Sequence, residues 1–84
     1  MSGLVKRSFS LAGHRTSVAL EPEFWTALAA IAGVSGLTLS AYVAATDAAR
    51  DPERPLASAL RVQALLEAKK SHKPRFFRFA LTFP

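Results

Sequence analysis

The side chains best suited to chemistry in this chain are its lysines and arginines, which are gathered toward the two ends. Residues 1–19 contain three basic residues and no acid, and residues 69–84 contain five basic residues and no acid. Residues 20–68 contain all six acids and only three arginines, and the formal net charge of the chain is +5. Basic arms beside an acidic body favour polyanion binding, because they neutralise phosphates and release counterions. A second interpretation is that both arms are solvated, mobile ends.

No combination of residues typical of an active site is present. The sequence lacks a Ser/His/Asp or Cys/His set, a glycine-rich phosphate loop and a metal-ligand cluster. His14 and His72 have neither carboxylates nor thiolates in company, so no metal site is predicted. Glu21 and Glu23 are close together, but they lie at an expected helix start, where the helix dipole explains them. We therefore expect no enzymatic activity, no cofactor and no metal.

Length and composition favour a small domain that needs another chain. Eighty-four residues bury a core poorly without disulfides, metals or oligomerisation, and the chain has no cysteine. Half of the residues are hydrophobic, which is enough for a core shared between chains. Lys6 and Arg7 are not followed by the apolar stretch of a secretory signal, so a cytoplasmic location is expected.

An alternating segment leads directly into a helix. In residues 15–20, Val18 and Leu20 lie on one face of a predicted strand. Pro22 suits the first position of a helix, with Glu21 as its cap. A single short strand cannot fold alone, so this pattern predicts pairing with a second chain.

The residues before this strand are out of phase with it. Phe9 and Leu11 alternate at odd positions, whereas the apolar residues of the strand are at even positions. A continuous strand cannot bury both sets on one face, so we expect a bulge or turn at Gly13. Residues 1–14 are then either a kinked extension of the strand or an independent basic arm.

Apolar spacing predicts three helices, over residues 22–34, 38–50 and 56–70. Gly36 suits the end of the first helix, and Thr38 or Ser40 can cap the second. Two prolines in residues 51–55 form a linker that is expected to detach the third helix from the body.

The C-terminal tail, residues 71–84, combines basic and aromatic residues. Those that could bind a partner are Arg75, Phe76, Phe77, Arg78 and Phe79. They could stack on bases, insert at a membrane surface or dock in a protein groove, and disorder is a further interpretation.

Residues 26–46 carry no charge and are long enough to span a bilayer. Glycine and hydroxyl residues dilute the segment, and a helix end is predicted in its middle, so a membrane partner is not expected.

The order of one strand and two helices resembles the ribbon-helix-helix family (Arc/MetJ-like). Several segments are similar to a subfamily of short bacterial ribbon-helix-helix domain proteins: Lys-Arg-Ser at 6–8, Gly-His-Arg-Thr-Ser at 13–17, Leu-Glu at 20–21, Phe-Trp at 24–25 and Ala-Ser-Ala-Leu-Arg-Val at 57–62. The similarity covers residues 6–66, and the tail lies outside it.

This resemblance implies a mostly α fold in which the N-terminal strand pairs antiparallel with that of a second chain in an intertwined homodimer. Residues 15–50 would be the ribbon-helix-helix core, with an extra C-terminal helix and tail. The implied dimer core consists of Val18, Leu20, Phe24, Trp25, Leu28, Ile31 and Val43.

The resemblance also implies that the outward face of the ribbon enters the major groove of DNA. Arg15, Ser17 and Ala19 would contact bases, although Ala19 can only touch a thymine methyl where such proteins usually carry a polar side chain. The implied phosphate contacts are Lys6, Arg7, His14, Thr38 and Ser40. Alternatively, Arg15 pairs with Glu21 or Glu23 across the dimer.

The resulting prediction is a dimeric DNA-binding protein that regulates transcription. The alternative is a protein-interaction module, either antitoxin-like or an accessory subunit of a larger complex, that binds its partner through residues 56–84.

Overall fold

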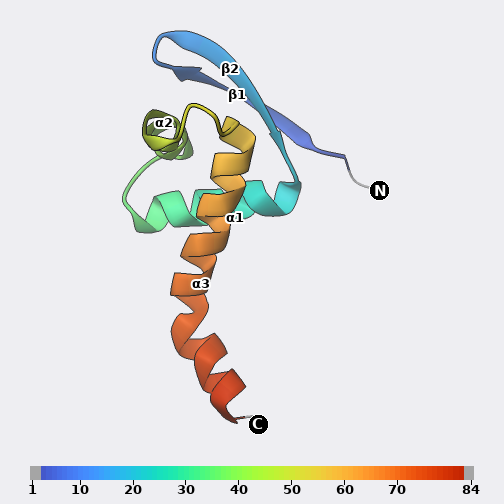
Figure 1. Ribbon diagram of the computed structural model, residues 1–84, viewed down its shortest axis with the longest axis vertical. Coiled ribbons are helices and arrows are strands. Elements are labelled where there is room, and N and C mark those ends of the chain that lie inside the picture. Colours follow the sequence, from blue (N-terminus) through green and yellow to red (C-terminus); the bar gives the residue numbers. More distant parts are fainter. Residues whose placement is uncertain (1–2, 83–84) are drawn as a thin grey trace.

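The computed structural model describes the backbone of residues 3–82 and the side chains of residues 3–70. Two strands are followed by three helices: β1 (Val5–Leu11), β2 (His14–Leu20), α1 (Pro22–Val34), α2 (Leu39–Ala49) and α3 (Leu56–Thr82). The strands form a hairpin that lies over the helices, and α3 crosses α1 and then extends away from the body (Figure 1). The ribbon, the two helices and the additional C-terminal helix confirm the predicted fold class.

The hairpin differs from the prediction in its second strand, which comes from the same chain. β1 pairs antiparallel with β2, in a register that runs from Val5 opposite Leu20 to Leu11 opposite His14. Ala12 and Gly13 connect the strands with φ angles of 52° and 82°. Two successive positive φ angles define a type I′ turn, whose twist matches that of paired strands. The phase correction expected at Gly13 is therefore a chain reversal, and residues 5–11 are a strand instead of an arm.

This reversal brings the two out-of-phase apolar sets together. Phe9 and Leu11 from β1 and Val18 and Leu20 from β2 are all buried against the helices. Because β2 runs back along β1, odd positions of one strand lie opposite even positions of the other. One chain thus builds a two-stranded sheet with a single apolar face.

One chain buries most of the residues that the sequence predicted to lie in a core shared between two chains. Its fully buried centre consists of Leu20, Leu28, Val43 and Leu60. Of the residues predicted to form a dimer core, five are buried here within the chain, and Phe24 and Ile31 are partly buried against them.

The ends of α1 follow from residues that the sequence marks clearly. Pro22 occupies the first turn as predicted. At the other end Gly36 adopts a φ of 76°, and the N–H of Leu37 donates to the carbonyl of Ala32 at 2.8 Å. The N–H of Gly36 also donates to the carbonyl of Gly33 at 3.0 Å, which completes a Schellman motif. Gly36 is therefore the predicted glycine that ends the helix.

The start of α1 has the predicted residue at its N-cap position. Glu21 occupies the N-cap position, but its side chain makes no capping hydrogen bond. The carboxylate instead binds Arg61 of α3. Glu21 is therefore the N-cap residue, as predicted, and its side chain caps no backbone N–H because a guanidinium brought close by the fold binds the carboxylate.

α3 is not detached from the body, contrary to the prediction from the two prolines. It packs against α1, α2 and β2, and its Leu60 is fully buried. Arg50 joins the end of α2 to the segment just before α3. Its Nε donates to Asp47 Oδ1 at 2.9 Å, and its Nη1 donates to the carbonyl of Arg54 at 2.7 Å. The helix also continues past residue 70 to Thr82. Helix propagation gains one hydrogen bond per added residue, and only Pro74 lacks a donor there.

Within residues 3–82, no single helix is long and apolar enough to cross a membrane. α1 and α2 reach that length and composition only together, and they are bent by 94° at the break between them.

Candidate nucleic-acid interface

One face of the hairpin is buried, and the other is polar and points away from the helices. We call the latter the outer face; it consists of Lys6, Ser8 and Ser10 from β1 and Arg15, Ser17 and Ala19 from β2. Ala19 is half-buried and the other five side chains are exposed. The strands alternate side chains between faces, so burial of the apolar set fixes the position of the polar set.

The outer face is arranged in three cross-strand pairs. Ser10 lies opposite Arg15 beside the turn, Ser8 opposite Ser17 in the middle, and Lys6 opposite Ala19 at the far end. The two hydroxyl oxygens of Ser8 and Ser17 are 3.0 Å apart and share a hydrogen bond. A basic side chain therefore lies at each end of a short row of hydroxyl groups.

The charge on this face is positive. Residues 5–20 contain no aspartate or glutamate. Among the side chains of residues 3–70, neither Lys6 nor Arg15 forms an ion pair. The carboxylate of Glu21, one alternative partner of Arg15, is bound to Arg61 within the same chain. Five donors on the Arg15 guanidinium and three on the Lys6 ammonium remain available to an external acceptor.

The residues predicted to contact phosphate are spread over several elements. Lys6 lies on the outer face, and His14 is exposed where β2 begins beside the turn. Thr38 and Ser40 are exposed at the start of α2, where Thr38 Oγ1 accepts a hydrogen bond from the Ala41 N–H at 3.0 Å. The first N–H groups of a helix attract anions, so this end of α2 is chemically suited to a phosphate.

Arg7 lies on the opposite side of the ribbon from Lys6. Its guanidinium carbon is 5.4 Å from the centre of the Trp25 ring, a cation–π arrangement. Trp25 also donates from Nε1 to the carbonyl of Val5 at 2.7 Å and packs against Phe9, with 5.8 Å between ring centroids. The contacts of Trp25 with Arg7, Val5 and Phe9 therefore hold β1 against α1. They also place Arg7 away from the other residues predicted to contact phosphate.

An ion pair fixes the junction between the ribbon and the helices. Arg61 Nη2 and Nε each lie 2.9 Å from Glu21 Oε1, and the guanidinium carbon is 5.7 Å from the centre of the Phe24 ring. A hydrogen bond from the backbone of Glu21, together with the hydrogen bond and charge of Arg61, lowers the pKa of the Glu21 carboxyl below its ordinary value of 4.5. The pair connects α3 to the point where β2 becomes α1.

Residues 4–68 match the family described as the ribbon-helix-helix domain, which is well over half of the 84-residue chain. The chain belongs to the ribbon-helix-helix family. Members of this family are in general DNA-binding transcription regulators and are not enzymes. No curated protein and no solved structure matched the chain.

The matched residues include both strands of this ribbon-helix-helix protein. The polar half of β1 is the part of its outer face that the sequence analysis did not identify. The pattern of the sequence predicts no contact from Ser8 or Ser10 and only a phosphate contact from Lys6. The alternation of Lys6, Ser8 and Ser10 with Phe9 and Leu11 indicates a strand with one polar face. The sequence does not mark the turn at Ala12, and without this turn the strand cannot be assigned to the same sheet as β2.

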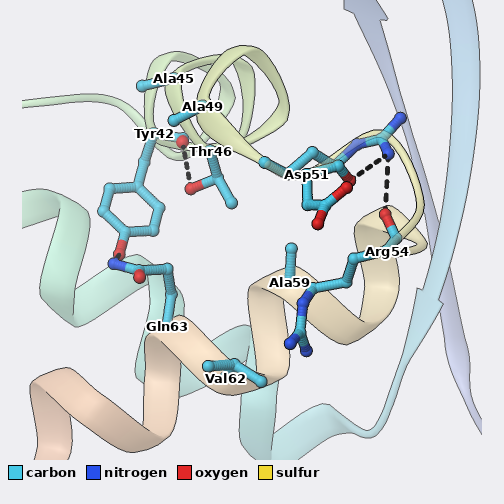
Figure 2. Close-up of a pocket in the computed structure, with 10 residues that line it drawn as sticks. Tyr42, Ala45, Thr46, Ala49, Asp51, Arg54, Ala59, Val62 and Gln63 are labelled. Carbon is cyan, nitrogen blue, oxygen red and sulfur yellow. Dashed lines mark hydrogen bonds between the residues drawn. The ribbon is translucent and has the colours of Figure 1, made fainter.

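A pocket of about 390 Å³ lies between α2 and α3 (Figure 2). Tyr42 and Gln63 lie on one side of it, and Asp51 and Arg54 lie on the other. Gln63 Nε2 donates to Tyr42 Oη at 3.2 Å, and Thr46 Oγ1 donates to the Tyr42 carbonyl at 3.0 Å. The Gln63–Tyr42 bond joins α3 to α2, whereas the Thr46–Tyr42 bond lies within α2, and the buried Tyr42 side chain serves packing.

Two further predictions concern other parts of the ribbon-helix-helix protein. Arg75, Phe76, Phe77, Arg78 and Phe79 lie outside the residues whose side chains the structure describes. Within the described side chains, no group of three histidine, cysteine, aspartate or glutamate residues could hold a metal ion.

Proposed function

We propose that this protein is a transcription regulator whose β1–β2 ribbon enters the major groove of duplex DNA. The observation that carries the proposal is the outer face, which is polar, exposed and basic at both ends, with no acid on either strand. The major groove is about 12 Å wide and admits a two-stranded ribbon. The proposal also implies a cytoplasmic location.

The side chains of β2 suit base edges in the groove. Arg15 can donate two hydrogen bonds to O6 and N7 of guanine, Ser17 can bond to several bases, and Ala19 can touch a thymine methyl. His14, Thr38 and Ser40 are candidates for phosphate contacts that set the position of the ribbon. Arg7 is a weaker candidate, because its guanidinium is stacked on Trp25.

We further propose that the protein acts as a homodimer. Members of the family typically dimerise, and one chain leaves three apolar side chains of α3 exposed: Val62, Leu65 and Leu66 are 36%, 59% and 47% accessible. Light scattering should give twice the chain mass of 9.0 kDa at micromolar concentration. A single-chain mass that persists at high concentration would rule out this part of the proposal.

DNA binding is tested by fluorescence anisotropy with duplex DNA over a range of salt concentrations. The logarithm of the binding constant should fall linearly with the logarithm of salt concentration, and Arg15→Ala should weaken binding to a preferred sequence by about 5- to 100-fold. Arg54→Ala is the matched control, because Arg54 precedes α3, is not part of the outer face, and bonds Ser58 through its Nη1. If Arg15→Ala and Ser17→Ala bind as the wild type does, the ribbon does not read DNA.

A protein-interaction module is the second candidate function. The observation in its favour is an apolar groove of about 390 Å³ between α1 and α3, lined mainly by Phe24, Ala27, Val62, Leu65 and Ala68. Co-purification of the tagged chain from its own cell distinguishes the two functions. A protein that is retained by the Arg15→Ala variant but lost on deletion of residues 71–84 would favour the interaction module.

A further inference from the structure

The ribbon of this protein is formed by one chain. The turn at Ala12 and Gly13 connects β1 to β2 covalently, and the register between the strands is continuous from Val5 to Leu11. The two strands of this ribbon therefore exist side by side without a second copy. They also carry different side chains on the outer face, because Lys6, Ser8 and Ser10 are not a repeat of Arg15, Ser17 and Ala19.

Lys6 occupies a specific place on this face. It lies directly opposite Ala19, the position of β2 whose side chain has no hydrogen-bonding group. Side chains directly opposite each other in an antiparallel pair have their Cβ atoms about 5 Å apart, so the Lys6 side chain starts beside the position where Ala19 offers no hydrogen-bonding group. The ammonium is exposed and forms no ion pair among the described side chains.

The neighbouring residue shows that this placement is not a general property of the basic N-terminal segment. Arg7 carries the same charge one position later, yet it lies on the helix-facing side with its guanidinium over Trp25. A one-residue step along a strand reverses the face. A ligand that lies on the outer face is therefore expected to contact Lys6 and not Arg7.

We propose that each chain reads DNA with its own complete ribbon, and that Lys6 is a specificity-determining residue that donates to the O6 and N7 acceptors of guanine in the place of Ala19. This inference rests on the proposed major-groove binding of the ribbon. Arg15 and Ala19 are four residues apart, which corresponds to about 13 Å along a strand and about four base-pair steps. The two basic readers, Arg15 and Lys6, thus contact separate base pairs at opposite ends of the ribbon.

The second consequence is asymmetry. A ribbon formed by two identical strands has a two-fold axis at its centre, and the bases beneath it are read as a palindrome. The β1–β2 ribbon has no such axis, so the base pairs beneath one ribbon form a non-palindromic sequence with one position set by Arg15 and another by Lys6. In a homodimer each half-site would be read by one chain.

The inference is tested by selecting bound sequences from a pool of randomised duplex DNA with the full chain and with single variants. The wild type should select a non-palindromic sequence beneath each ribbon. Lys6→Ala and Lys6→Gln should each lose a discrimination of about 5- to 100-fold at one base pair, whereas Arg15→Ala should lose it at a position about four base pairs away. Lys69→Ala, which removes an exposed lysine of α3, should leave the selected sequence unchanged.

The possible failures are distinguishable. If Lys6→Ala weakens binding equally on all sequences while Arg15→Ala still changes base preference, Lys6 is a phosphate contact and only this inference is overturned. A palindrome centred beneath a single ribbon would also overturn it and would leave major-groove binding intact. Absence of salt-dependent duplex binding by the wild type would overturn both the inference and the proposed function.

Discussion

Ala12 is the residue at which the backbone of the hairpin is most strained. It adopts a φ of 52°, the left-handed region that costs a residue with a Cβ about 1–2 kcal/mol. Asparagine tolerates this conformation better, and Asn-Gly is the favoured pair of a type I′ turn. We therefore expect Ala12→Asn to raise the free energy of unfolding by about 0.5–1 kcal/mol in urea denaturation.

A second alanine provides the matched control for this prediction. Ala30 is exposed within α1, where asparagine is a poorer helix former than alanine. Ala30→Asn should therefore lower the free energy of unfolding by about 0.5 kcal/mol. If both substitutions change stability in the same direction, the turn is not strained in solution.

The candidate site shows what the sequence can predict at the scale of residues. Strict alternation places Arg15 and Ser17 on the face opposite Val18 and Leu20, and the structure has this arrangement. The cross-strand neighbours of Arg15 and Ser17 were not predicted. They depend on the turn, and alanine is not a residue that normally marks a position with positive φ.

At the scale of elements, the start of α2 combines a stability contact with a proposed DNA contact. Thr38 Oγ1 accepts a hydrogen bond from the Ala41 N–H at 3.0 Å, whereas the exposed Ser40 side chain makes no such cap. Thr38→Ala should lower the free energy of unfolding by about 1 kcal/mol, and Ser40→Ala should change it by less than about 0.5 kcal/mol. Thermal or urea unfolding measures both values.

These two variants also separate folding from binding. If the α2 N-terminus lies on phosphate, Ser40→Ala should weaken DNA affinity with little loss of stability. Thr38→Ser keeps the capping oxygen and should restore most of the stability lost in Thr38→Ala. Equal stability of all three variants would contradict the role of Thr38 as a cap.

The Glu21–Arg61 pair connects α3 to the ribbon and should make stability depend on pH. The pKa of Glu21 is lowered in the folded chain, so the pair stabilises the protein at pH values above the ordinary pKa of 4.5. Its contribution should decline as the pH falls below 4.5 and the carboxylate takes up a proton. Unfolding curves recorded between pH 7 and pH 3 should show a smaller decline for Arg61→Gln than for the wild type.

The helix boundaries explain why some elements were predictable from the sequence and others were not. Pro22 and Gly36 act through their own backbones, so local sequence was sufficient to place the ends of α1. The Glu21–Arg61 pair joins residues 40 positions apart, and nothing local identifies such a partner. The prolines at 52 and 55 correctly indicated a break between helices, but they could not show that Arg50 holds the connection closed.

At the scale of the whole molecule, α3 completes the core that the ribbon and the first two helices leave open. Leu60 is fully buried at the centre of this core, whereas Leu65, five residues later, is 59% accessible. Removing a buried leucine side chain loses its transfer free energy and leaves a cavity, so Leu60→Ala should lower the free energy of unfolding by about 2–5 kcal/mol. Urea denaturation at low protein concentration measures this loss.

Leu65→Ala is the matched control, because it removes the same atoms from the same helix at an exposed position. If the fold depends only on contacts within one chain, its effect should stay below about 0.5 kcal/mol. An effect that grows with protein concentration would show that a second copy covers Leu65, because association adds stability by mass action. A loss as large as that of Leu60→Ala even at low concentration would contradict the one-chain core, since Leu65 contributes little to it in this structure.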